Sequence, residues 1–473
     1  MQKFRKPTRE ELNQLSKEEL IDLVLALVDK IEALENRIAR LEKNSSNSSK
    51  PPSSDINKPN RNQSQRKKSG NPSGGQNGHE GFTRNQAENP DEIIKIFPEA
   101  CEKCGKNLSQ KKATLGIKRQ EFDIPPITPY VTEYQSMKII CKCGYCNSGI
   151  FPEHIKAPVQ FGPNICSFAI YLNTRHIMPY ERLKMIFSDL LNFNISEGSI
   201  ENILQRAYEN GKHLHSEILQ NVKKQSWIGA DETSASVEGT KWWLWVWQNL
   251  IGTFYAITDN RGYKTIKELF GENYKGRMVH DCWMAQFKTP AKGGHQPCHE
   301  HLCRELQFVI EYEKSIWAWV IRFFLKRSQK ERDRIWKKGF DPVLRKKIIA
   351  QYQKEFEKLL EYPVKGREEI RMKERFLKYK GNVLFFMLSS DMPYHNNSSE
   401  QAIRMAKIKQ KVSYGFRSKN GAQRYAVLLS IIETCKKQGL SIFESLKTLF
   451  CCSEKRKLQL RLLRSLQLAK FLQ

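Results

Sequence analysis

Residues 227–258 read WIGADETSASVEGTKWWLWVWQNLIGTFYAIT, in which aromatic and β-branched runs are separated by glycine and polar turns. In the middle run, tryptophans alternate with Leu244 and Val246. Such runs are typical of β-strands, and short turns between them favour antiparallel neighbours. The stretch predicts three consecutive antiparallel strands, with Asp231 on the first strand. The four tryptophans are expected in the core, and stacking on planar rings of a ligand is the alternative.

The period of the sequence changes after the turn at Asn260-Arg261-Gly262. Apolar residues recur at helical spacing over residues 263–270, and Gly271 follows as a helix stop. Residues 278–281 read MVHD, which predicts a short strand that ends on a second acid, Asp281. Three strands, a helix and a fourth strand indicate the opening of a ribonuclease-H-like α/β fold.

A third acid begins a predicted helix further along the chain. Residues 396–400 read NNSSE, and Arg404, Lys407 and Lys411 follow Glu400 at helical spacing, so one helix face carries a carboxylate and then cations. Taken alone, this pattern also describes a solvated amphipathic helix. The two upstream acids favour a site.

The three acids suit phosphodiester chemistry. Hydrolysis or transfer of a phosphodiester uses two divalent ions about 3.5–4 Å apart, one at the attacking oxygen and one at the leaving oxygen. Hard oxygen ligands suit Mg²⁺. We expect Asp231 to bridge two Mg²⁺ ions, Asp281 to bind one and Glu400 to complete the other.

Short motifs along most of the chain resemble the insertion-sequence-66 family of DDE transposases, the transposase C type. In chain order these motifs are residues 48–55, Gly75-Gln76, Gly78-His79, the paired cysteines from Cys101, residues 230–233, residues 280–283, Cys298 with His301, residues 304–306, Asn397 with Glu400 and Arg404, and residues 415–418. Two departures are Glu400-Gln401, where the family usually has Glu-Arg, and His299-Glu300, which replaces a small or apolar pair.

The resemblance implies a Mg²⁺-dependent enzyme that cuts DNA at the ends of its own element and joins the freed 3′ hydroxyls to target DNA. It also implies small accessory transposition proteins as partners. In that interpretation Asp231, Asp281 and Glu400 are catalytic metal ligands. Four cations, Arg404, Lys407, Lys411 and Arg417, position phosphates.

The composition agrees with a nucleic-acid partner. The net charge is +28 and the isoelectric point is near 9.5, and a cationic protein gains affinity for DNA by releasing counterions. A membrane surface would also attract this charge. However, no apolar run is long enough to span a bilayer and no secretory core follows the N-terminal residues, so we expect a cytoplasmic, nucleoid-associated bacterial protein without membrane association.

The N-terminal region predicts a helix followed by a linker. Apolar residues alternate by four and three between Leu20 and Leu41, which predicts a coiled coil over residues 1–43 and a homo-oligomer; a helix packed on its own chain is the alternative. Residues 44–90 are rich in Ser, Asn, Pro, Gly, Lys and Arg and predict a disordered basic linker.

Paired cysteines in residues 91–155 predict a zinc ribbon with one structural Zn²⁺. The ligands we expect are Cys101, Cys104, Cys143 and Cys146, with Cys141 in reserve because three cysteines compete for the second pair. Buried free thiols are the alternative. The close pairs among the chain's 12 cysteines indicate reduced thiols rather than disulfides.

The rest of the chain is predicted to be mainly helical outside the catalytic sheet. Residues 160–225 suggest a helix-turn-helix-like region, in which DNA binding and simple packing are equally good interpretations. The catalytic domain comprises residues 226–300 and 385–435, a helical insertion occupies 301–384, and a basic helical tail occupies 436–473. Cys298 and His301 form a C-x-x-H pair for which structural bracing is favoured over metal binding, because two ligands make no complete site.

Two alternatives to a transposase remain open. One is a ribonuclease-H-like DNA nuclease that hydrolyses without strand joining, and the other is a zinc-ribbon DNA-binding regulator whose catalytic domain is dead. A strand-joining assay separates the first alternative from a transposase. The three intact acids count against the second.

The predicted ribbon has a direct test in the metal content of the protein. Freshly purified, reduced protein should carry about one Zn²⁺ from this site, and Cys101→Ser should lose it, because small metal domains take their folding energy from the ion. Metal analysis that finds no zinc would contradict the ribbon. Zinc retained in Cys143→Ser would identify Cys141 as the ligand.

Overall fold

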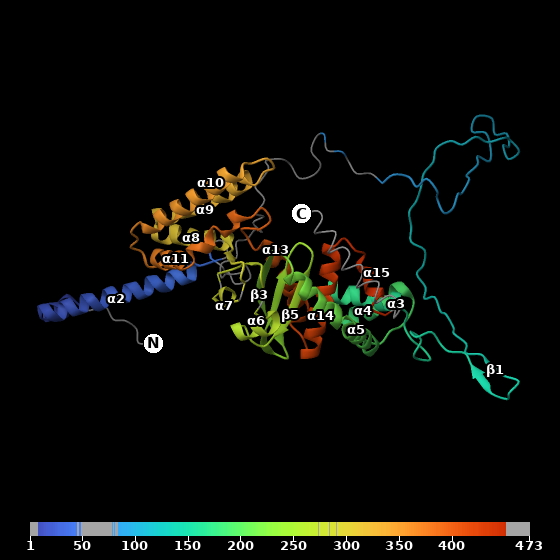
Figure 1. The fold of residues 1–473 in the computed structure, drawn as a ribbon. Helices are drawn as coiled ribbons and strands as arrows, with labels where there is room; N and C mark the ends of the chain where they lie inside the picture. The colour runs from blue at the N-terminus through green and yellow to red at the C-terminus, as the bar shows by residue number, and fades with distance from the viewer. Residues whose placement is uncertain are drawn as a thin grey trace. The chain divides into compact units, whose positions relative to one another are not determined.

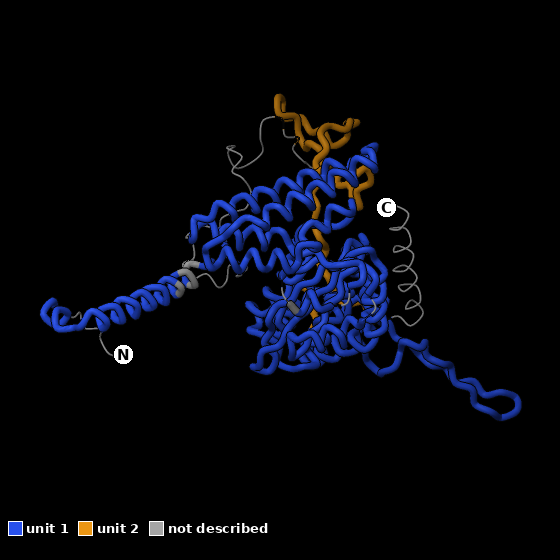
Figure 2. Tube along the Cα trace, turned by 60° about the vertical axis from the view of Figure 1, so that its left-hand side comes forward, with its two compact units in different colours: residues 1–58, 132–188, 194–473 blue, residues 59–131, 189–193 orange. Residues whose placement is uncertain are grey.

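The computed structural model describes residues 8–44, 47–48, 78, 80, 84–272, 274–282, 284–289 and 291–450. The predicted basic linker lies mostly outside these residues, as do residues 451–473 of the predicted tail. The chain divides into two compact units, and each is described by itself (Figure 2): residues 1–58, 132–188 and 194–473 form the first, and residues 59–131 and 189–193 form the second.

The first unit contains a five-stranded mixed sheet with the strand order β5-β4-β3-β6-β7 (Figure 1). The antiparallel part consists of β3 (Trp227–Val237), β4 (Thr240–Gln248) and β5 (Thr253–Thr258). Next to β3 lie β6 (Arg277–His280) and then β7 (His295–Pro297), both parallel to their neighbours. The predicted three antiparallel strands and the fourth strand are confirmed.

The alternation in β4 explains how this strand is covered on both faces. Leu244 and Val246 pack into a cluster with residues of two C-terminal helices, α13 (Asn397–Ser413) and α14 (Lys419–Lys437). Trp245 and Trp247 point to the opposite face, because successive side chains of a strand alternate. Trp245 and Trp247 are fully buried, which confirms the prediction for these two, whereas Trp242 and Trp243 are only partly buried.

The opposite face of the sheet is covered by α6 (Tyr263–Phe270). The ring of Phe270 stacks on Trp247 with 5.5 Å between centroids. Gly271 ends the helix with φ 79°, a left-handed conformation that glycine adopts without strain. The predicted helix and its stop are confirmed.

Several helices precede the sheet in the chain: α3 (Pro163–Ile170), the π-helix η2 (Tyr171–Arg175), α4 (Tyr180–Leu191) and α5 (Glu197–Lys223). They pack against the helices that follow the sheet, α14 and α15 (Ile442–Lys447). Ser196 caps α5, which continues to Lys223, near the end of the predicted helical region. Its apolar face packs on α14, where a Cβ at Gly211 would lie 2.8 Å from Ile431 Cδ1.

The segment between the second and third acids is helical, as predicted, and has its own core. It contains α7 (Met284–Lys288), α8 (His299–Glu313), α9 (Ile316–Ile335), α10 (Pro342–Glu361), α11 (Arg367–Lys378), α12 (Lys380–Val383) and the 3-10 helix η3 (Phe385–Leu388). Figure 1 shows α8 to α11 gathered in one bundle. Buried aromatic rings fill this bundle, among them Phe324, Phe356 and Phe376.

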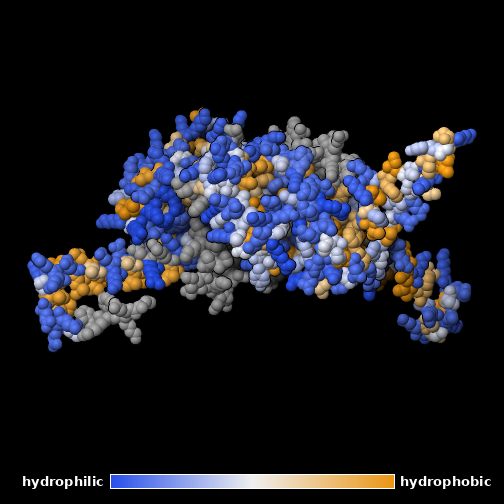
Figure 3. Space-filling view, turned by 90° about the horizontal axis from the view of Figure 1, so that it is seen from below, coloured by the Kyte–Doolittle hydropathy of each residue, from blue (hydrophilic) through white to orange (hydrophobic). Residues whose placement is uncertain are grey.

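The N-terminal residues form α1 (Arg9–Asn13) and α2 (Lys17–Glu42), each opened by a capping box at Thr8 or Ser16. Along α2, Leu27, Ile31 and Leu34 are 39–55% exposed. Figure 3 shows apolar side chains along the length of this helix. The predicted apolar seam from Leu20 to Leu41 lies within α2, while its pairing as a coiled coil stays a prediction. None of the helices in the described part of the chain has both the length and the apolar character to cross a membrane.

The exposed seam of α2 predicts self-association. Replacing Leu27 and Leu34 with Lys would bury charge in a paired seam, so the double variant should dissociate to a smaller species in light scattering. The matched control is Ala26→Lys with Ala33→Lys, which adds the same charge beside the seam and should leave the assembly intact. A wild-type protein that is monomeric with and without DNA would contradict this prediction.

Candidate active site

Two of the three predicted acids lie on neighbouring parallel strands. The register pairs Gly229 on β3 with Val279 on β6. Asp231, inside β3, and Asp281, just after the end of β6, each follow two residues later, so they lie beside one another across this strand pair. Burial raises the pKa of Asp231 well above its usual range, and the nearby charges of Asp281 and Glu232 raise it further.

Glu400 completes the group from the first turn of α13. Its negative charge also raises the pKa of Asp231, although less than burial and the charge of Asp281 do. Its carboxylate belongs to the half-buried part of the helix, since the side chain is 32% exposed. Asp231, Asp281 and Glu400 thus come from three elements and lie near enough for their charges to act on Asp231, although their carboxylate oxygens do not all lie within 4.8 Å of one another.

A polar network holds the start of α13 against β3. Asn396 donates through Nδ2 to the Ala230 carbonyl at 2.7 Å, one residue before Asp231. Gln248 on β4 donates to Ser398 Oγ at 2.7 Å and to Ser399 Oγ at 3.1 Å. These bonds fix the helix turn that carries Glu400.

Asn396 and Gln248 are positioning residues that the sequence did not reveal. Asn396 opens the NNSSE segment, and its 1% exposure shows that it belongs to the interior. Gln248 ends the tryptophan strand without any motif. Lys437 on α14 donates to Gln248 Oε1 at 2.5 Å and so links a third element to the network; burial lowers the pKa of this lysine to about 7.

Glu232, the acid next to Asp231, has a different role. Its carboxylate accepts from Arg261 Nε at 2.9 Å and from Gln286 Nε2 at 2.9 Å, and its side chain is 1% exposed. A buried carboxylate that is paired with a guanidinium and an amide is already satisfied. Glu232 is thus a structural anion, which leaves Asp231 as the acid available in this pair.

Cys298 and His301 lie next to Glu400. One ligand atom from each of these three residues lies within 4.8 Å of the others. His301 Nδ1 is 3.6 Å from Glu400 Oε1, and Arg304 Nη2 is 3.8 Å from the same oxygen. Burial lowers the pKa of His301, and the charge of Arg304 lowers it further, so the imidazole is neutral at pH 7. The sequence motif, which we expected to act as a structural brace, faces a predicted catalytic acid.

His299 and Glu300, the two residues between Cys298 and His301, both have partners in the helical insertion. His299 is fully buried, and its imidazole bonds to the Val383 carbonyl at 2.7 Å and to Gln329 at 3.1 Å. Glu300 forms an ion pair with Lys326 at 2.7 Å. Both contacts anchor the start of α8 within the helical insertion.

The predicted phosphate-contacting residues lie on α13 and just beyond it. Arg404, Lys411 and Arg417 are exposed and Lys407 is half-buried. In the described part of the chain, no acidic side chain pairs with any of them. Gly415, before Arg417, has φ 136°, and a Cβ there would lie 2.7 Å from the Ser236 carbonyl, so only glycine lets this loop approach β3.

The predicted zinc ligands lie on short turns in both units. In the second unit, Gly105 N donates to the Cys101 carbonyl, and bonds from Cys104 and Lys103 lower the pKa of the Cys101 thiol. In the first unit, Cys141 precedes a similar turn with Gly144, and bonds from Cys143 lower its pKa. Cys146 begins β2 (Cys146–Ser148), which pairs with β1 (Lys138–Ile140). The zinc site stays a prediction, with Cys143 and Cys146 as the expected second pair and Cys141 in reserve.

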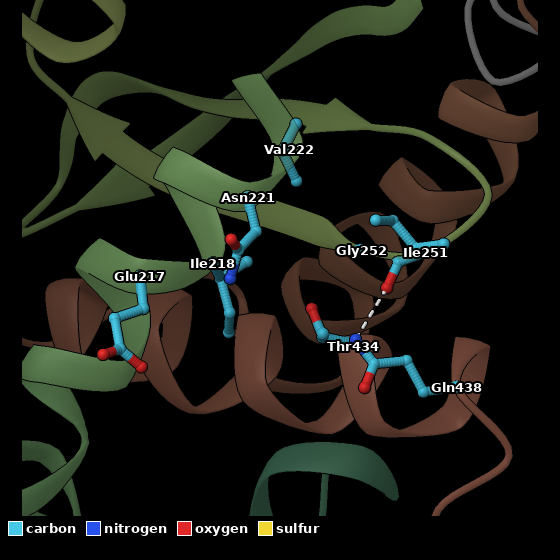
Figure 4. A pocket seen from close by; sticks show the side chains of 8 residues that line it. All are labelled: Glu217, Ile218, Asn221, Val222, Ile251, Gly252, Thr434 and Gln438. Carbon is cyan, nitrogen blue, oxygen red and sulfur yellow. Dashed lines mark hydrogen bonds between the residues drawn. The ribbon is translucent and has the colours of Figure 1, made fainter. Parts of the chain in front are cut away.

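Hollows in the first unit lie elsewhere. Figure 4 shows a small one between α5, the β4–β5 turn and α14, where Gln438 Nε2 donates to the Ile251 carbonyl at 3.1 Å. A larger one of 540 Å³ lies beside Gly415 to Ser418 and is lined by Lys409 and Arg424 among others. None of the three acids lines either of these two hollows.

The raised pKa of Asp231 predicts how its charge affects stability. An acid whose pKa is higher in the folded than in the unfolded state favours folding at low pH, and this contribution is lost as the pH rises from its unfolded value of about 3.9 through its folded value. At pH 7 and without added divalent metal, Asp231→Asn should therefore raise Tm, by about 2–4 °C.

The matched control for this measurement is Glu232→Gln. It removes the charge that pairs with Arg261, so Tm should fall rather than rise. Calorimetry of both variants at pH 7 tests the contrast. A lower Tm for Asp231→Asn than for the wild type would show that Asp231 is not under charge repulsion.

Comparison with known proteins agrees with these findings. Residues 158–424 of 473 match the model of the transposase IS66 family, and residues 3–85 match a family of unknown function. An uncharacterised protein of Sinorhizobium fredii, y4jO, is 27% identical over 127 residues, which cover 26% of this chain and 40% of that relative. The IS66 match covers more than half of the chain and includes Asp231, Asp281 and Glu400, so the chain belongs to the transposase IS66 family.

Proposed function

We propose that this chain is a DNA transposase that cleaves strands at the ends of its own element and joins the freed 3′ ends to target DNA by a two-metal mechanism. Family membership supports the transposase role. The observation that carries the mechanism is the convergence of Asp231, Asp281 and Glu400.

The acids fit a divalent cation. All three offer hard oxygen ligands, which Mg²⁺ prefers, and their mutual repulsion at Asp231 would be relieved by bound positive charge. When bound, two Mg²⁺ ions would activate the attacking oxygen and stabilise the leaving oxygen of a phosphodiester. Asp231 is the central ligand, because the negative charges of Asp281 and Glu400 both raise its pKa.

The chain's own residues arrange this site and its DNA. Asn396 and Gln248 hold α13 so that Glu400 stays beside Asp231. Arg404, Lys411 and Arg417 present unpaired charge to solvent within the described part of the chain, which suits phosphates. A helix that carries an acid at its start and cations behind it would guide the DNA backbone to the acids.

The fold and the partners belong to the same proposal. Three antiparallel strands followed by two parallel ones, with an acid on the central strand, support a ribonuclease-H-like catalytic domain. We also propose one structural Zn²⁺ in the region of residues 91–155 and assembly through α2. Both would serve to hold two element ends in one complex.

Alanine substitutions test the three acids. Asp231→Ala, Asp281→Ala or Glu400→Ala should each lower Mg²⁺-dependent cleavage of end DNA by at least about 10²–10³-fold, the loss typical of removing a preorganised electrostatic group. DNA binding should be nearly unchanged, because the metals act on the reaction more than on docking. Asp259→Ala, which removes an exposed acid after β5, is the control and should retain cleavage.

The same assay separates a transposase from a nuclease. A pre-cut end with a free 3′ hydroxyl is mixed with a target plasmid and Mg²⁺, and joined product is measured. Joining that the three variants lack supports strand transfer. Cleavage by the wild type without any joining would leave a hydrolytic nuclease, and full activity in any of the three variants would remove that acid from the site.

A further inference from the structure

Three different metal-binding groups meet at the start of α8 and of α13. Cys298 lies at the N-cap of α8, His301 lies in its first turn, and Glu400 lies in the first turn of α13. Their ligand atoms lie within 4.8 Å of one another, and they form the one group of three or more such residues found among the described residues of the first unit. The sequence suggested only two of these ligands.

A second observation points to a missing partner. In the described structure, His301 Nδ1 and Glu400 Oε1 are both buried and neither has a hydrogen-bond partner. Buried polar atoms are nearly always satisfied, and an unsatisfied pair is costly. The two atoms lie 3.6 Å apart, too far for a hydrogen bond and close to the spacing of about 3.3–3.7 Å between ligand atoms on a tetrahedral ion with bonds of 2.0–2.3 Å.

We propose that Cys298, His301 and Glu400 bind Zn²⁺, and that this ion withdraws Glu400 from Asp231 and Asp281. The donor set of one thiolate, one imidazole and one carboxylate selects Zn²⁺ over Mg²⁺, because Mg²⁺ avoids sulfur ligands. Three protein ligands leave a fourth position for water, as in open zinc sites.

The surroundings of Cys298 suit a metal-bound thiolate. Burial raises the pKa of the Cys298 thiol to about 12, so the free thiol keeps its proton, but the backbone N–H groups of His301 and Asn396, the latter at 3.2 Å, lower the pKa and would stabilise a metal-bound sulfur. N–H groups at the start of a helix stabilise negative charge. On binding, the Cys298 S–H bond breaks, the S–Zn bond forms and the proton passes to solvent, with no change in oxidation state.

Glu400 then has two alternative environments. Its carboxylate can face Asp231 and Asp281, or it can bind beside Cys298 and His301. Arg304, at 3.8 Å, gives Glu400 a cationic neighbour in the absence of zinc. Zinc at this site would therefore act as an inhibitor that competes for one catalytic ligand; this second part rests on the proposed function, whereas the site itself does not.

Metal content tests the site without any activity measurement. Full-length, reduced protein is dialysed against Zn²⁺, and bound zinc is counted for the wild type and Cys298→Ala. The wild type should hold one more equivalent than the variant. Cys303→Ala is the matched control, because it removes another buried thiol of α8 outside the cluster and should match the wild type.

A spectroscopic measurement supports the count. Co²⁺ in place of zinc should give a sulfur-to-metal charge-transfer band. In Cys298→Ala this band should lose the absorbance of one thiolate, while the absorbance from the predicted ribbon should not change. His301→Ala is the second variant in case Cys298→Ala does not fold, and it should also lose one equivalent. Equal zinc in the wild type and in a folded variant of either residue would overturn the site.

Cleavage assays test the sharing of Glu400. With Mg²⁺ fixed and Zn²⁺ added, wild-type cleavage should fall more than tenfold, whereas Cys298→Ala, normalised to its own rate in Mg²⁺ alone, should fall much less. If zinc binds at the site but inhibits cleavage by the wild type and by Cys298→Ala to the same extent, the proposed competition for Glu400 is wrong. If the wild type shows no cleavage in Mg²⁺, the proposed function fails while the metal count still decides the site.

Discussion

The close contact between β3 and the start of α13 is the constraint on which the site depends. A Cβ at Gly229 would overlap Ser399 Oγ and lie 2.8 Å from Gln248 Nε2, so only glycine lets the helix approach the strand this closely. Hydrogen bonds from Asn396 and Gln248 then fix the orientation of the helix. Because Glu400 is the residue after Ser399, this contact brings a third carboxylate to the two acids of the sheet.

Bringing three carboxylates together has an electrostatic cost that the rest of the site limits. Asp231 carries most of it, since burial and neighbouring charges raise its pKa. The adjacent Glu232 is neutralised by Arg261, so its charge is balanced within the fold. The remaining repulsion falls on the acids that suit a divalent cation, so the same feature that weakens the metal-free fold would favour metal binding.

The helical insertion begins at the site rather than remote from it. β7 ends at Pro297, and Cys298 then starts α8, whose first turn faces Glu400. Glu305, one turn further, accepts from Arg371 and Arg375 and so ties α8 to α11. The insertion therefore contacts Glu400, the proposed catalytic acid, through the first turn of α8.

The sequence predicted the type and order of the secondary-structure elements, but not which distant residues meet in the fold. Alternating and helical periods predicted β3 to β6, α6 and the helix of Glu400, because these periods reflect which face of each element is buried. The sequence also named the three acids, with support from a family resemblance; their catalytic role, the zinc ribbon and the coiled coil stay predictions. Asn396, Gln248 and the meeting of Cys298 with Glu400 could not be predicted, since they depend on strand register and on how closely α13 packs on Gly229. Such contacts join residues far apart in the chain, and no local period encodes them.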